Sequence, residues 1–305
     1  MPHAPLLSSP YTSVTLKTLV DLAQPASGLS CHHQRIKARQ SGGYISRFKG
    51  RGMEFDETRL YQRGDDIRSI DWRVTARTGK THTKIFREER ERPVFISVDL
   101  RETMHFASRG VFKSVMAAKL AALLAWAAHH RGDRCGGQLF FDTHCLELKP
   151  QNGKQAVLHF LHLLATATQS SFLPEKNNAD THTLESVLSR LLAHAKPSSL
   201  LYLISDFRGL TPHAQIQLSK LAAHCEVVLL CIYDSLEANL PRAGHYSFTQ
   251  NAQYITISNA QRAQFDTYQQ HFLQKQQQLQ TLAKQRGMIF IPISTHMDPL
   301  TCLKM

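Results

Sequence analysis

The fold of this chain is decided by two stretches of its sequence, PVFISVD at residues 93–99 and SLLYLISD at residues 199–206. Each is a short apolar run that ends in an aspartate and leads toward a helix. Because buried strands of parallel sheets have nearly continuous apolar sequences, both stretches predict such strands. The two acids, Asp99 and Asp206, are then expected close together at the carboxyl edge of one sheet.

The rest of residues 93–305 continues this alternation. Residues 111–130 are apolar nearly all round and predict a buried helix, with Lys113 and Lys119 as its only Lys, Arg, Asp or Glu residues. Strands alternating with helices imply an α/β domain with a doubly wound, mostly parallel sheet flanked by helices. The remaining predicted helices are 154–166, 184–193, 212–224 and 259–285, and the remaining predicted strands are 134–141, 143–148, 226–233, 254–258 and 288–293.

The first 92 residues have a different composition. Residues 1–30 are predicted to be an N-terminal extension with one short helix near 14–22. Residues 31–92 are punctuated by glycines and contain short strand-like stretches such as 44–48 and 81–86, with no helical period. Glycine-bounded short strands predict a small β-rich module.

The net charge of +12 is concentrated in this module. Residues 35–92 contain sixteen Lys and Arg against nine Asp and Glu. A basic segment of this kind suits binding to nucleic acid or docking to an acidic protein, and with so many acids interleaved it also suits a solvated surface. Composition alone leaves these three alternatives open.

Several classes of protein are excluded by the sequence. The longest apolar run, Leu120–Ala128, is far shorter than the roughly 20 residues of a membrane span, so no membrane insertion is expected. No secretory signal is expected, because the first residues lack a basic region followed by an apolar core. The six cysteines form no CxxC pair, which predicts reduced thiols in a cytoplasmic protein.

The sequence contains none of the common catalytic motifs, so the protein is predicted not to be an enzyme. The chain has no HExxH, no GxSxG and no Cys/His zinc spacing. Gly79-Lys80-Thr81 resembles the end of a phosphate-binding loop, but the glycine required five residues earlier is Val74. What remains is the pair Asp99 and Asp206, which would either hold a hard divalent cation or cap the segments that follow.

Residues 50–92 carry a family resemblance. They include GRGMEF (50–55), RLYQRGDDIRSIDW (59–72), ARTGK (76–80) and FREERER (86–92). This string resembles the hallmark of the bacterial domain-of-unknown-function family 58. Residues 94–99, 113–133 and 199–206 resemble the von Willebrand factor A-like domain of the same family. The resemblance covers roughly residues 30–295 and is to the short form that lacks the membrane helices of many relatives.

The resemblance implies a non-enzymatic protein-interaction module. Such proteins are associated with MoxR-type AAA ATPases in chaperone-like assembly or maturation of other proteins, so an ATPase of this type is the expected partner. The alternative, from a different class, is a nucleic-acid-binding protein that uses the arginine-rich segment 35–92.

The resemblance also implies a metal-ion-dependent adhesion site, and this chain departs from it. Asp99 and Asp206 match two ligand positions, and Thr103 replaces a serine, so these three would hold magnesium if the site were intact. Arg101, however, stands where another serine belongs, and Thr183 matches the second-loop threonine only with a shift, as does Thr181, because His182 occupies that position. We therefore expect a degenerate adhesion site, Asp99, Arg101, Thr103, Thr183 and Asp206, with no tightly bound magnesium and no other cofactor.

Two orientations of Arg101 are compatible with the sequence. Turned inward, its guanidinium pairs bidentately with Asp99 or Asp206 and takes the place of the ion. Turned outward, it faces solvent and the site is simply lost.

The signature string contains alternating charges beside a tryptophan, which predicts a packed network of partly buried ion pairs. The alternative is a contact surface for a partner. The residues concerned are Arg59, Asp65, Asp66, Arg68, Asp71, Trp72 and Arg77.

Overall fold

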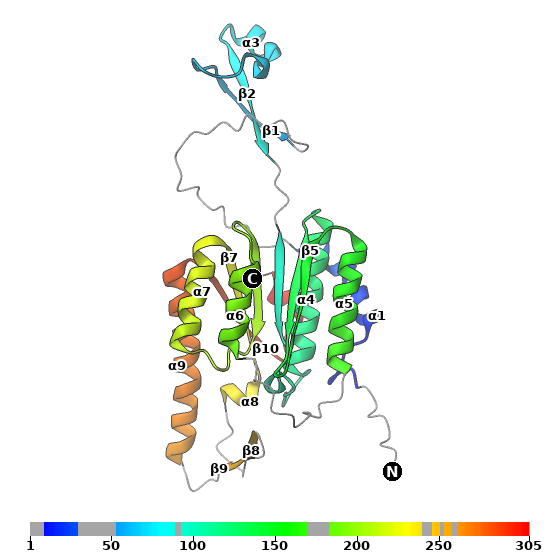
Figure 1. Ribbon diagram of the computed structural model, residues 1–305, viewed down its shortest axis with the longest axis vertical. Helices are drawn as coiled ribbons and strands as arrows, with labels where there is room; N and C mark the ends of the chain where they lie inside the picture. The colour runs from blue at the N-terminus through cyan, green and yellow to red at the C-terminus, as the bar shows by residue number, and fades with distance from the viewer. Residues whose placement is uncertain are drawn as a thin grey trace. The chain divides into compact units, whose positions relative to one another are not determined.

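A computed structural model of the protein describes residues 9–29, 53–88, 93–169, 183–239, 246–250, 253–257 and 262–304 (Figure 1). The chain divides into two compact units. The main unit comprises residues 1–32 and 92–305, and the small unit comprises residues 33–91.

The main unit is built on a six-stranded sheet with the strand order β10-β7-β6-β3-β4-β5. All neighbouring pairs are parallel except β4 and β5, which form an antiparallel hairpin. From the central strand β3 the chain builds outward first to one side, through β4, and then to the other, through β6, so the predicted doubly wound α/β class is confirmed. The strands are β3 (Val94–Asp99), β4 (Cys135–Phe140), β5 (Cys145–Gln151), β6 (Leu200–Ser205), β7 (Glu226–Tyr233) and β10 (Ile289–Ser294).

Helices cover both faces of this sheet. One face carries α1 (Leu16–Asp21), α2 (Ala23–Ala26), α4 (Lys113–His130), α5 (Lys154–Gln169) and α10 (Pro299–Cys302). The other carries α6 (Leu184–His194), α7 (Pro212–His224) and α9 (Arg262–Arg286). Alternate residues of β3 enter the two cores, as expected from the period of two in a strand: Val94, Ile96 and Val98 face one core and Phe95 the other.

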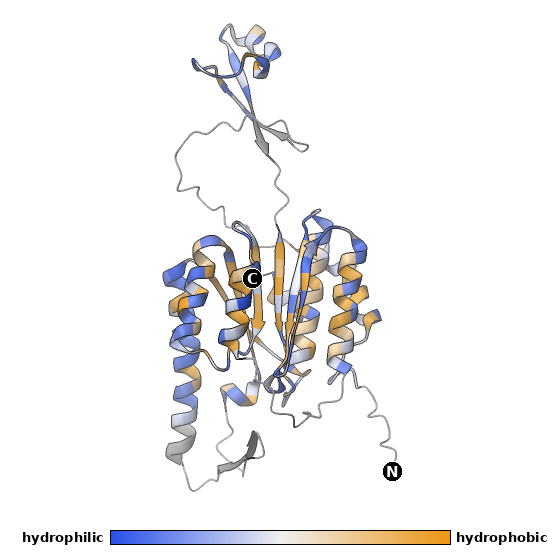
Figure 2. Cartoon of the chain, in the orientation of Figure 1, coloured by the Kyte–Doolittle hydropathy of each residue, from blue (hydrophilic) through white to orange (hydrophobic). Residues whose placement is uncertain are grey.

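Hydropathy follows these layers. Figure 2 shows the sheet and α4 mostly in hydrophobic colours and much of α9 in hydrophilic ones. Within the described residues, no helix combines the length and the apolar composition needed to cross a membrane. The remaining elements of the main unit are a 3-10 turn, η2 (Glu102–Met104), a short helix, α8 (Ser235–Ala238), which follows β7, and the hairpin of β8 (Tyr246–Gln250) and β9 (Gln253–Ile257).

The N-terminal residues belong to the main unit and not to a separate extension. Leu19 in α1 is fully buried, and its carbonyl oxygen accepts a hydrogen bond of 3.1 Å from Nε1 of Trp126 in α4. The amide of Phe112 donates to the carbonyl oxygen of Tyr11 at 2.8 Å. Helices of six and four residues are too short to show an apolar period, which is why the sequence pattern did not place them in the core.

The small unit, residues 33–91, contains a helix as well as strands, whereas the predicted 31–92 module was β-rich. Strands β1 (Met53–Leu60) and β2 (His82–Glu88) are antiparallel, and a 3-10 turn, η1 (Ile67–Ser69), and a helix, α3 (Trp72–Thr78), lie between them in the chain. The helix begins after its cap, Asp71, and ends at Gly79, whose φ of 69° suits a glycine. The predicted strand at 81–86 lies within β2 apart from its first residue, and the one at 44–48 lies outside the described residues.

Candidate functional site

Acids end three neighbouring strands of the main sheet. Asp99 is the last residue of β3, Asp206 follows β6, and Asp234 follows β7. Because these strands are adjacent and parallel, the three acids lie at one edge, and the predicted proximity of Asp99 and Asp206 is confirmed. Asp234 carries the same signal in the sequence, an apolar run ending in an acid. Its carboxylate accepts hydrogen bonds from the amide and hydroxyl of Ser108 and from the hydroxyl of Thr295, so it anchors the loop after β3.

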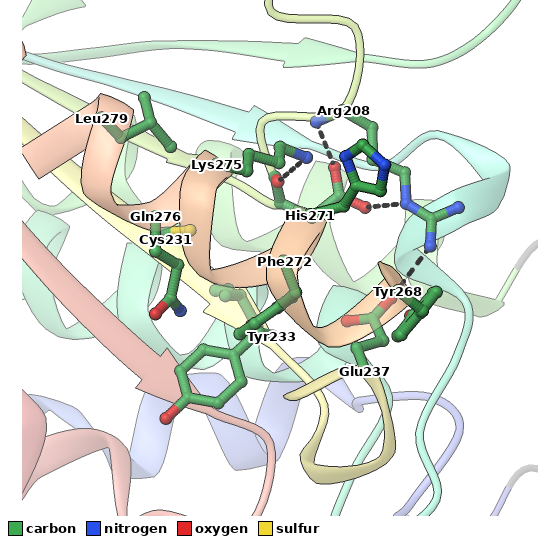
Figure 3. A pocket seen from close by; sticks show the side chains of 12 residues that line it. Arg208, Cys231, Tyr233, Glu237, Tyr268, His271, Phe272, Lys275, Gln276 and Leu279 are labelled. Atoms are coloured by element: carbon green, nitrogen blue, oxygen red, sulfur yellow. Dashed lines mark hydrogen bonds and ion pairs between the residues drawn. The ribbon is translucent and has the colours of Figure 1, made fainter. Parts of the chain in front are cut away.

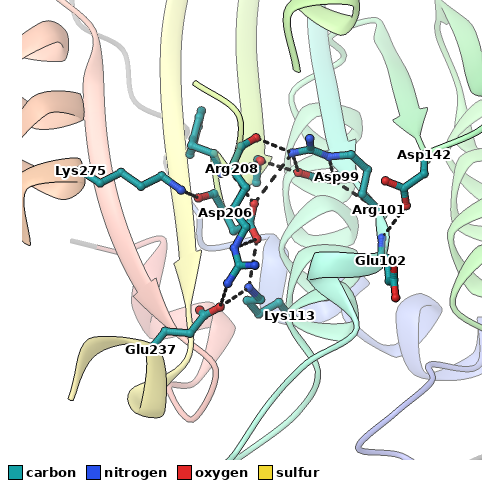
Figure 4. Close-up of polar contacts among 11 residues, drawn as sticks. Asp99, Arg101, Glu102, Lys113, Asp142, Asp206, Arg208, Glu237 and Lys275 are labelled. Carbon is teal, nitrogen blue, oxygen red and sulfur yellow. Dashed lines mark hydrogen bonds and ion pairs between the residues drawn. The ribbon is translucent and has the colours of Figure 1, made fainter. Parts of the chain in front are cut away.

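Arg101 turns inward and pairs with Asp99. Its Nε lies 3.0 Å from Oδ1 of Asp99 and its Nη2 lies 2.7 Å from Oδ2, which is the bidentate arrangement (Figure 4). The same Nη2 donates to the carbonyl oxygen of Arg208 at 3.2 Å and lies 3.9 Å from Oδ1 of Asp206. Arg101 is only 8% exposed and Asp99 is fully buried, so the pair forms the inner part of the site.

Ser205, the last residue of β6, completes the environment of Asp99. Its hydroxyl donates to Oδ2 of Asp99 at 2.6 Å and accepts from the amide of Phe207 at 2.8 Å. Full burial raises the pKa of Asp99, and the hydrogen bonds from Arg101 and Ser205 oppose that rise. Each oxygen of this buried carboxylate is therefore hydrogen-bonded.

Lys113 supplies a second internal cation. It is the first residue of α4 and its side chain is fully buried. Its Nζ donates to Oδ2 of Asp206 at 3.1 Å and to Oε1 of Glu237, in α8, at 2.8 Å. A cation at a helix N-terminus is disfavoured by the helix dipole, so these two acids are what make its position tenable.

Besides Lys113, two further cations, Arg208 and Lys275, lie next to Asp206 (Figure 4). The guanidinium of Arg208 lies 3.6 Å from Oδ2 of Asp206 and 3.2 Å from Oε1 of Glu237, and its side chain is 44% exposed. Nζ of Lys275, from α9, donates to the carbonyl oxygen of Asp206 at 3.1 Å. Burial by itself would raise the pKa of Asp206, but Lys113, Lys275 and Arg208 outweigh it and lower the pKa to about 2. Asp206 is therefore a carboxylate at every physiological pH.

These residues do not fit a magnesium ion. Both oxygens of Asp99 are taken by Arg101, and the guanidinium and the ammonium of Lys113 lie against the acids that would have to coordinate the metal. Magnesium requires near-octahedral oxygen ligation at about 2.0–2.1 Å and would be repelled by both cations. Among the described residues, moreover, no group of three His, Cys, Asp or Glu side chains is arranged to hold a metal.

We expect calorimetric titration with magnesium or manganese to show no binding with a dissociation constant below about 1 mM. The physical reason is that the ion would have to displace Arg101 from a buried bidentate pair, and breaking such a pair is costly. Micromolar binding that disappears in Asp99→Ala would contradict this expectation, and Asp298→Ala, which alters an acid of the α10 cap, is the control.

The two threonines of the predicted site are not brought into the cluster. Thr183 is the N-cap of α6, and its hydroxyl oxygen accepts from the amide of Ser186 at 3.2 Å. Oγ1 of Thr103 is buried and makes no hydrogen bond within the described part of the chain. Thr181 and His182 lie outside the described residues. The inner cluster of the site therefore consists of Asp99, Arg101, Lys113, Asp206 and Glu237.

The signature residues do not form one packed network, and that prediction is wrong. Arg59 and Asp65 form an ion pair of 2.7 Å, whereas Asp66 accepts a backbone hydrogen bond from Arg68. Trp72 is 68% exposed, and the side chains of Arg68 and Arg77 are exposed as well. The charges in this string serve local turns and caps, because segments this short are fixed mainly by side chain to backbone hydrogen bonds.

Asp71 has the clearest of these local roles, as the N-cap of α3. Its Oδ1 accepts from the amides of Arg73 and Val74, and its Oδ2 lies 4.0 Å from Nζ of Lys84. We expect Asp71→Ala to destabilise the small unit by about 1 kcal/mol, the usual cost of a lost N-cap, and not by the larger amount that breaking a buried ion pair would cost. Urea unfolding measures this, and Asp71→Asn, which keeps a capping oxygen, should be nearly neutral. Equal losses in both variants would show that the charge matters more than the cap.

Sequence reasoning missed four members of the site. Lys113 stood out as a lysine in an otherwise apolar helix, and such a residue needs a partner. Glu237 is part of a capping box with Asp234 at the start of α8. Arg208 and Lys275 gave no signal in the sequence, because nothing in their local pattern shows that they approach Asp206.

The model of the family described as "Protein of unknown function DUF58" matches residues 57–278. The uncharacterized proteins Rv1480 of Mycobacterium tuberculosis and Mb1516 of Mycobacterium bovis are each 28% identical to this chain over 211 residues, which is 69% of this chain. The match spans 64% of the length of each relative.

Solved structures show weaker similarity. The conserved hypothetical protein BatB of Bacteroides thetaiotaomicron aligns with 67% of this chain and 90% of its own, at 12% identity and a TM-score of 0.41. An uncharacterized membrane-spanning protein of Vibrio fischeri aligns with 69% of this chain and 94% of its own, at 17% identity and a TM-score of 0.23.

Proposed function

This chain belongs to the DUF58 family of proteins of unknown function, and from that premise we propose that it is a cytoplasmic, non-enzymatic protein-binding module. Its main unit acts as a von Willebrand A-like domain with a degenerate adhesion site. It works without a metal, and its partner supplies an acidic group to the carboxyl edge of the sheet. The support for each step comes from the geometry of that edge.

The architecture supports the von Willebrand A-like assignment. A doubly wound sheet places its binding crevice at the carboxyl ends of the strands, where the strand order reverses. In this chain the order reverses at β3, between β4 and β6, and the ends of β3 and β6 carry Asp99 and Asp206. The adhesion-site positions of the family therefore coincide with the binding edge that the topology defines.

The observation that carries the proposal is that internal cations pair with the acids of the predicted adhesion site. Arg101 occupies both oxygens of Asp99, and its Nη1 makes no hydrogen bond among the described residues. Arg208 is partly exposed beside it. Two guanidinium groups at one edge suit a carboxylate, since Nη1 of Arg101 and the exposed guanidinium of Arg208 can each donate to one of its oxygens. The surface can thus hold an acidic residue of a partner directly, with no ion between them.

We take the partner to be a MoxR-type AAA ATPase, and the shared task to be chaperone-like assembly or maturation of other proteins. The test is co-expression of the chain with the MoxR-type ATPase of the same genome, followed by size-exclusion chromatography. A complex that persists at about 0.5 M salt is expected, because packed interfaces resist screening better than exposed charge pairs do. Arg208→Glu should weaken this complex at least tenfold by putting like charges together.

Arg286→Glu is the matched control, because this exposed arginine lies at the far end of α9. It should leave the complex unchanged. No complex with the ATPase at any salt concentration would refute the proposed partner. Equal weakening by the two variants would show that the carboxyl edge is not the contact.

A second candidate function is nucleic-acid binding by the small unit. The observation in its favour is that Trp72, Arg73 and Arg77 are all exposed on α3. The two arginines are four residues apart on this helix. Aromatic and arginine side chains together can stack on unpaired bases. Binding to single-stranded DNA that falls steeply with salt, and that is lost in Trp72→Ala, would favour this candidate over the protein-binding one.

A further inference from the structure

A pocket of about 190 Å³ opens beside Asp206, between β7 and the long helix α9. Figure 3 shows Arg208, His271 and Lys275 gathered on one side of it and Tyr233 and Gln276 on another. None of the residues predicted from the sequence lines it except Asp206. The lining residues used below are Asp206, Arg208, Cys231, Glu237, Phe272, Lys275 and Leu279.

The polar side of the pocket carries two acids, Asp206 and Glu237, and two cations, Arg208 and Lys275, and it borders the fully buried cation Lys113. Asp206 and Glu237 are acids, but Lys113 and Arg208 each contact both of them, and Lys275 lies beside Asp206. Counting Lys113, which lies behind the pocket wall, three cations therefore surround two acids. One further negative charge would balance the cluster.

Lys275 is the cation best placed to receive that charge. Among the described residues its ammonium makes one hydrogen bond, to the carbonyl oxygen of Asp206, although an ammonium has three donors. Burial lowers the pKa of Lys275 against the opposing effect of Asp206, which means that its surroundings solvate the ammonium poorly. An anion in the pocket would supply the missing partner.

Beside these charged groups, part of the lining is apolar or aromatic. Leu279 is fully buried, Cys231 is buried, and Phe272 is partly buried and packs edge-to-face on Tyr233 with ring centroids 5.7 Å apart. A small inorganic anion would make no contact with the partly exposed ring of Phe272. A ligand that fills the pocket must carry an apolar or aromatic group next to its charge.

We propose that this pocket binds a carboxylate borne next to an aromatic or apolar group, presented by the protein partner, with Lys275 as its cationic contact. The proposal rests on the protein-binding function above and specifies the chemistry that the partner inserts. A carboxylate fits better than a phosphate, because a single negative charge balances the cluster.

The test uses N-acetyl-phenylalanine as the probe and N-acetyl-phenylalanine amide as its uncharged counterpart, each titrated into the full chain and followed by NMR. The acid should bind with a dissociation constant on the order of 1 mM, as expected for a ligand of this size. The amide should bind at least about tenfold more weakly, because it lacks the charge-assisted hydrogen bond. Inorganic phosphate at the same concentration should not displace the acid.

Lys275→Met should weaken binding of the acid at least about tenfold and leave the amide unaffected. Lys284→Met, nine residues further along α9 at an exposed position, is the matched control and should change neither. Equal binding of acid and amide, displacement by phosphate, unchanged binding in Lys275→Met, or no binding of the acid at 10 mM would each overturn the proposal. The comparison of acid with amide uses the unaltered chain, so it does not depend on the folding of a variant.

The source of the carboxylate is tested by competition. N-acetyl-phenylalanine at saturating concentration should release the bound ATPase from the chain, whereas the amide should not. If the acid binds but leaves a stable ATPase complex intact, the partner does not use the pocket and this inference fails while the proposed function stands. If the acid binds and no ATPase complex forms, the proposed function fails while the carboxylate pocket stands.

Discussion

Replacing Lys113 with methionine is expected to lower the free energy of unfolding of the main unit by about 3–5 kcal/mol. Methionine keeps the length and most of the packing of the side chain, so the loss comes from the charge. Asp206 and Glu237, which accept hydrogen bonds from Lys113 at 3.1 and 2.8 Å, would both lose a fully buried cation. At about 2–4 °C per kcal/mol for a unit of this size, the melting temperature should fall by about 6–20 °C.

Lys119→Met is the matched control for this experiment. It lies on the same helix as Lys113, but its side chain is partly exposed, and burial lowers its pKa. Its replacement should change the stability by no more than about 0.5 kcal/mol. The double variant Lys113→Met with Asp206→Asn should recover part of the loss, because it removes the acid left without its cation. Equal losses from the two lysine variants would show that Lys113 contributes through helix packing and not through the cluster.

Asp99→Asn should also destabilise the main unit by about 3–5 kcal/mol. Asparagine preserves the size of the side chain and one oxygen, but it places an amide nitrogen opposite Nη2 of Arg101, which lies 2.7 Å from Oδ2 of Asp99. The guanidinium would then be buried without its charge partner. A double-mutant cycle in urea with Arg101→Met should give a coupling energy of about 2–3 kcal/mol, because the two side chains act as one unit.

The chain contains a natural control for this pair. Arg131 and Asp133 are also two positions apart in the chain, and Nη2 of Arg131 lies 2.7 Å from Oδ2 of Asp133. Their side chains, however, are 25% and 12% exposed. Because an ion pair that keeps some contact with water is less costly to break than a fully buried one, Asp133→Asn should have a smaller effect than Asp99→Asn. A coupling energy for Asp99 and Arg101 as small as the effect of Asp133→Asn would refute their role as an internal replacement for a metal.

The fold was predictable because burial of its strands and longer helices leaves a recognisable pattern of apolar residues in the sequence. The strands β3 and β6 are buried along their whole length, so their sequences are continuous apolar runs that stand out without alignment. The short elements were not predictable for the opposite reason. Helices α2, α8 and α10 have four residues each, which is about one turn, and α3 has seven, so capping and tertiary contacts decide them.

The site was predictable only in part. Asp99 and Asp206 could be placed together because the carboxyl ends of adjacent parallel strands meet at one edge. The order of neighbouring strands, which makes β7 and its Asp234 part of the same edge, could not be read from the pattern. Thr183 was expected at the site from the resemblance, but its hydroxyl caps α6, a role that depends on where that helix begins.

What the sequence determined by itself is the α/β class, the two strand-end acids and the presence of an arginine where a metal ligand was expected. These follow from local rules of burial, period and side-chain chemistry, which act within a few residues. The tertiary structure alone decided which way Arg101 turns, and that Lys113, Glu237 and Lys275 are brought from three different helices to the surroundings of Asp206 and Arg208. Charges far apart in the chain interact strongly only where packing removes water between them, and the sequence does not show where that happens.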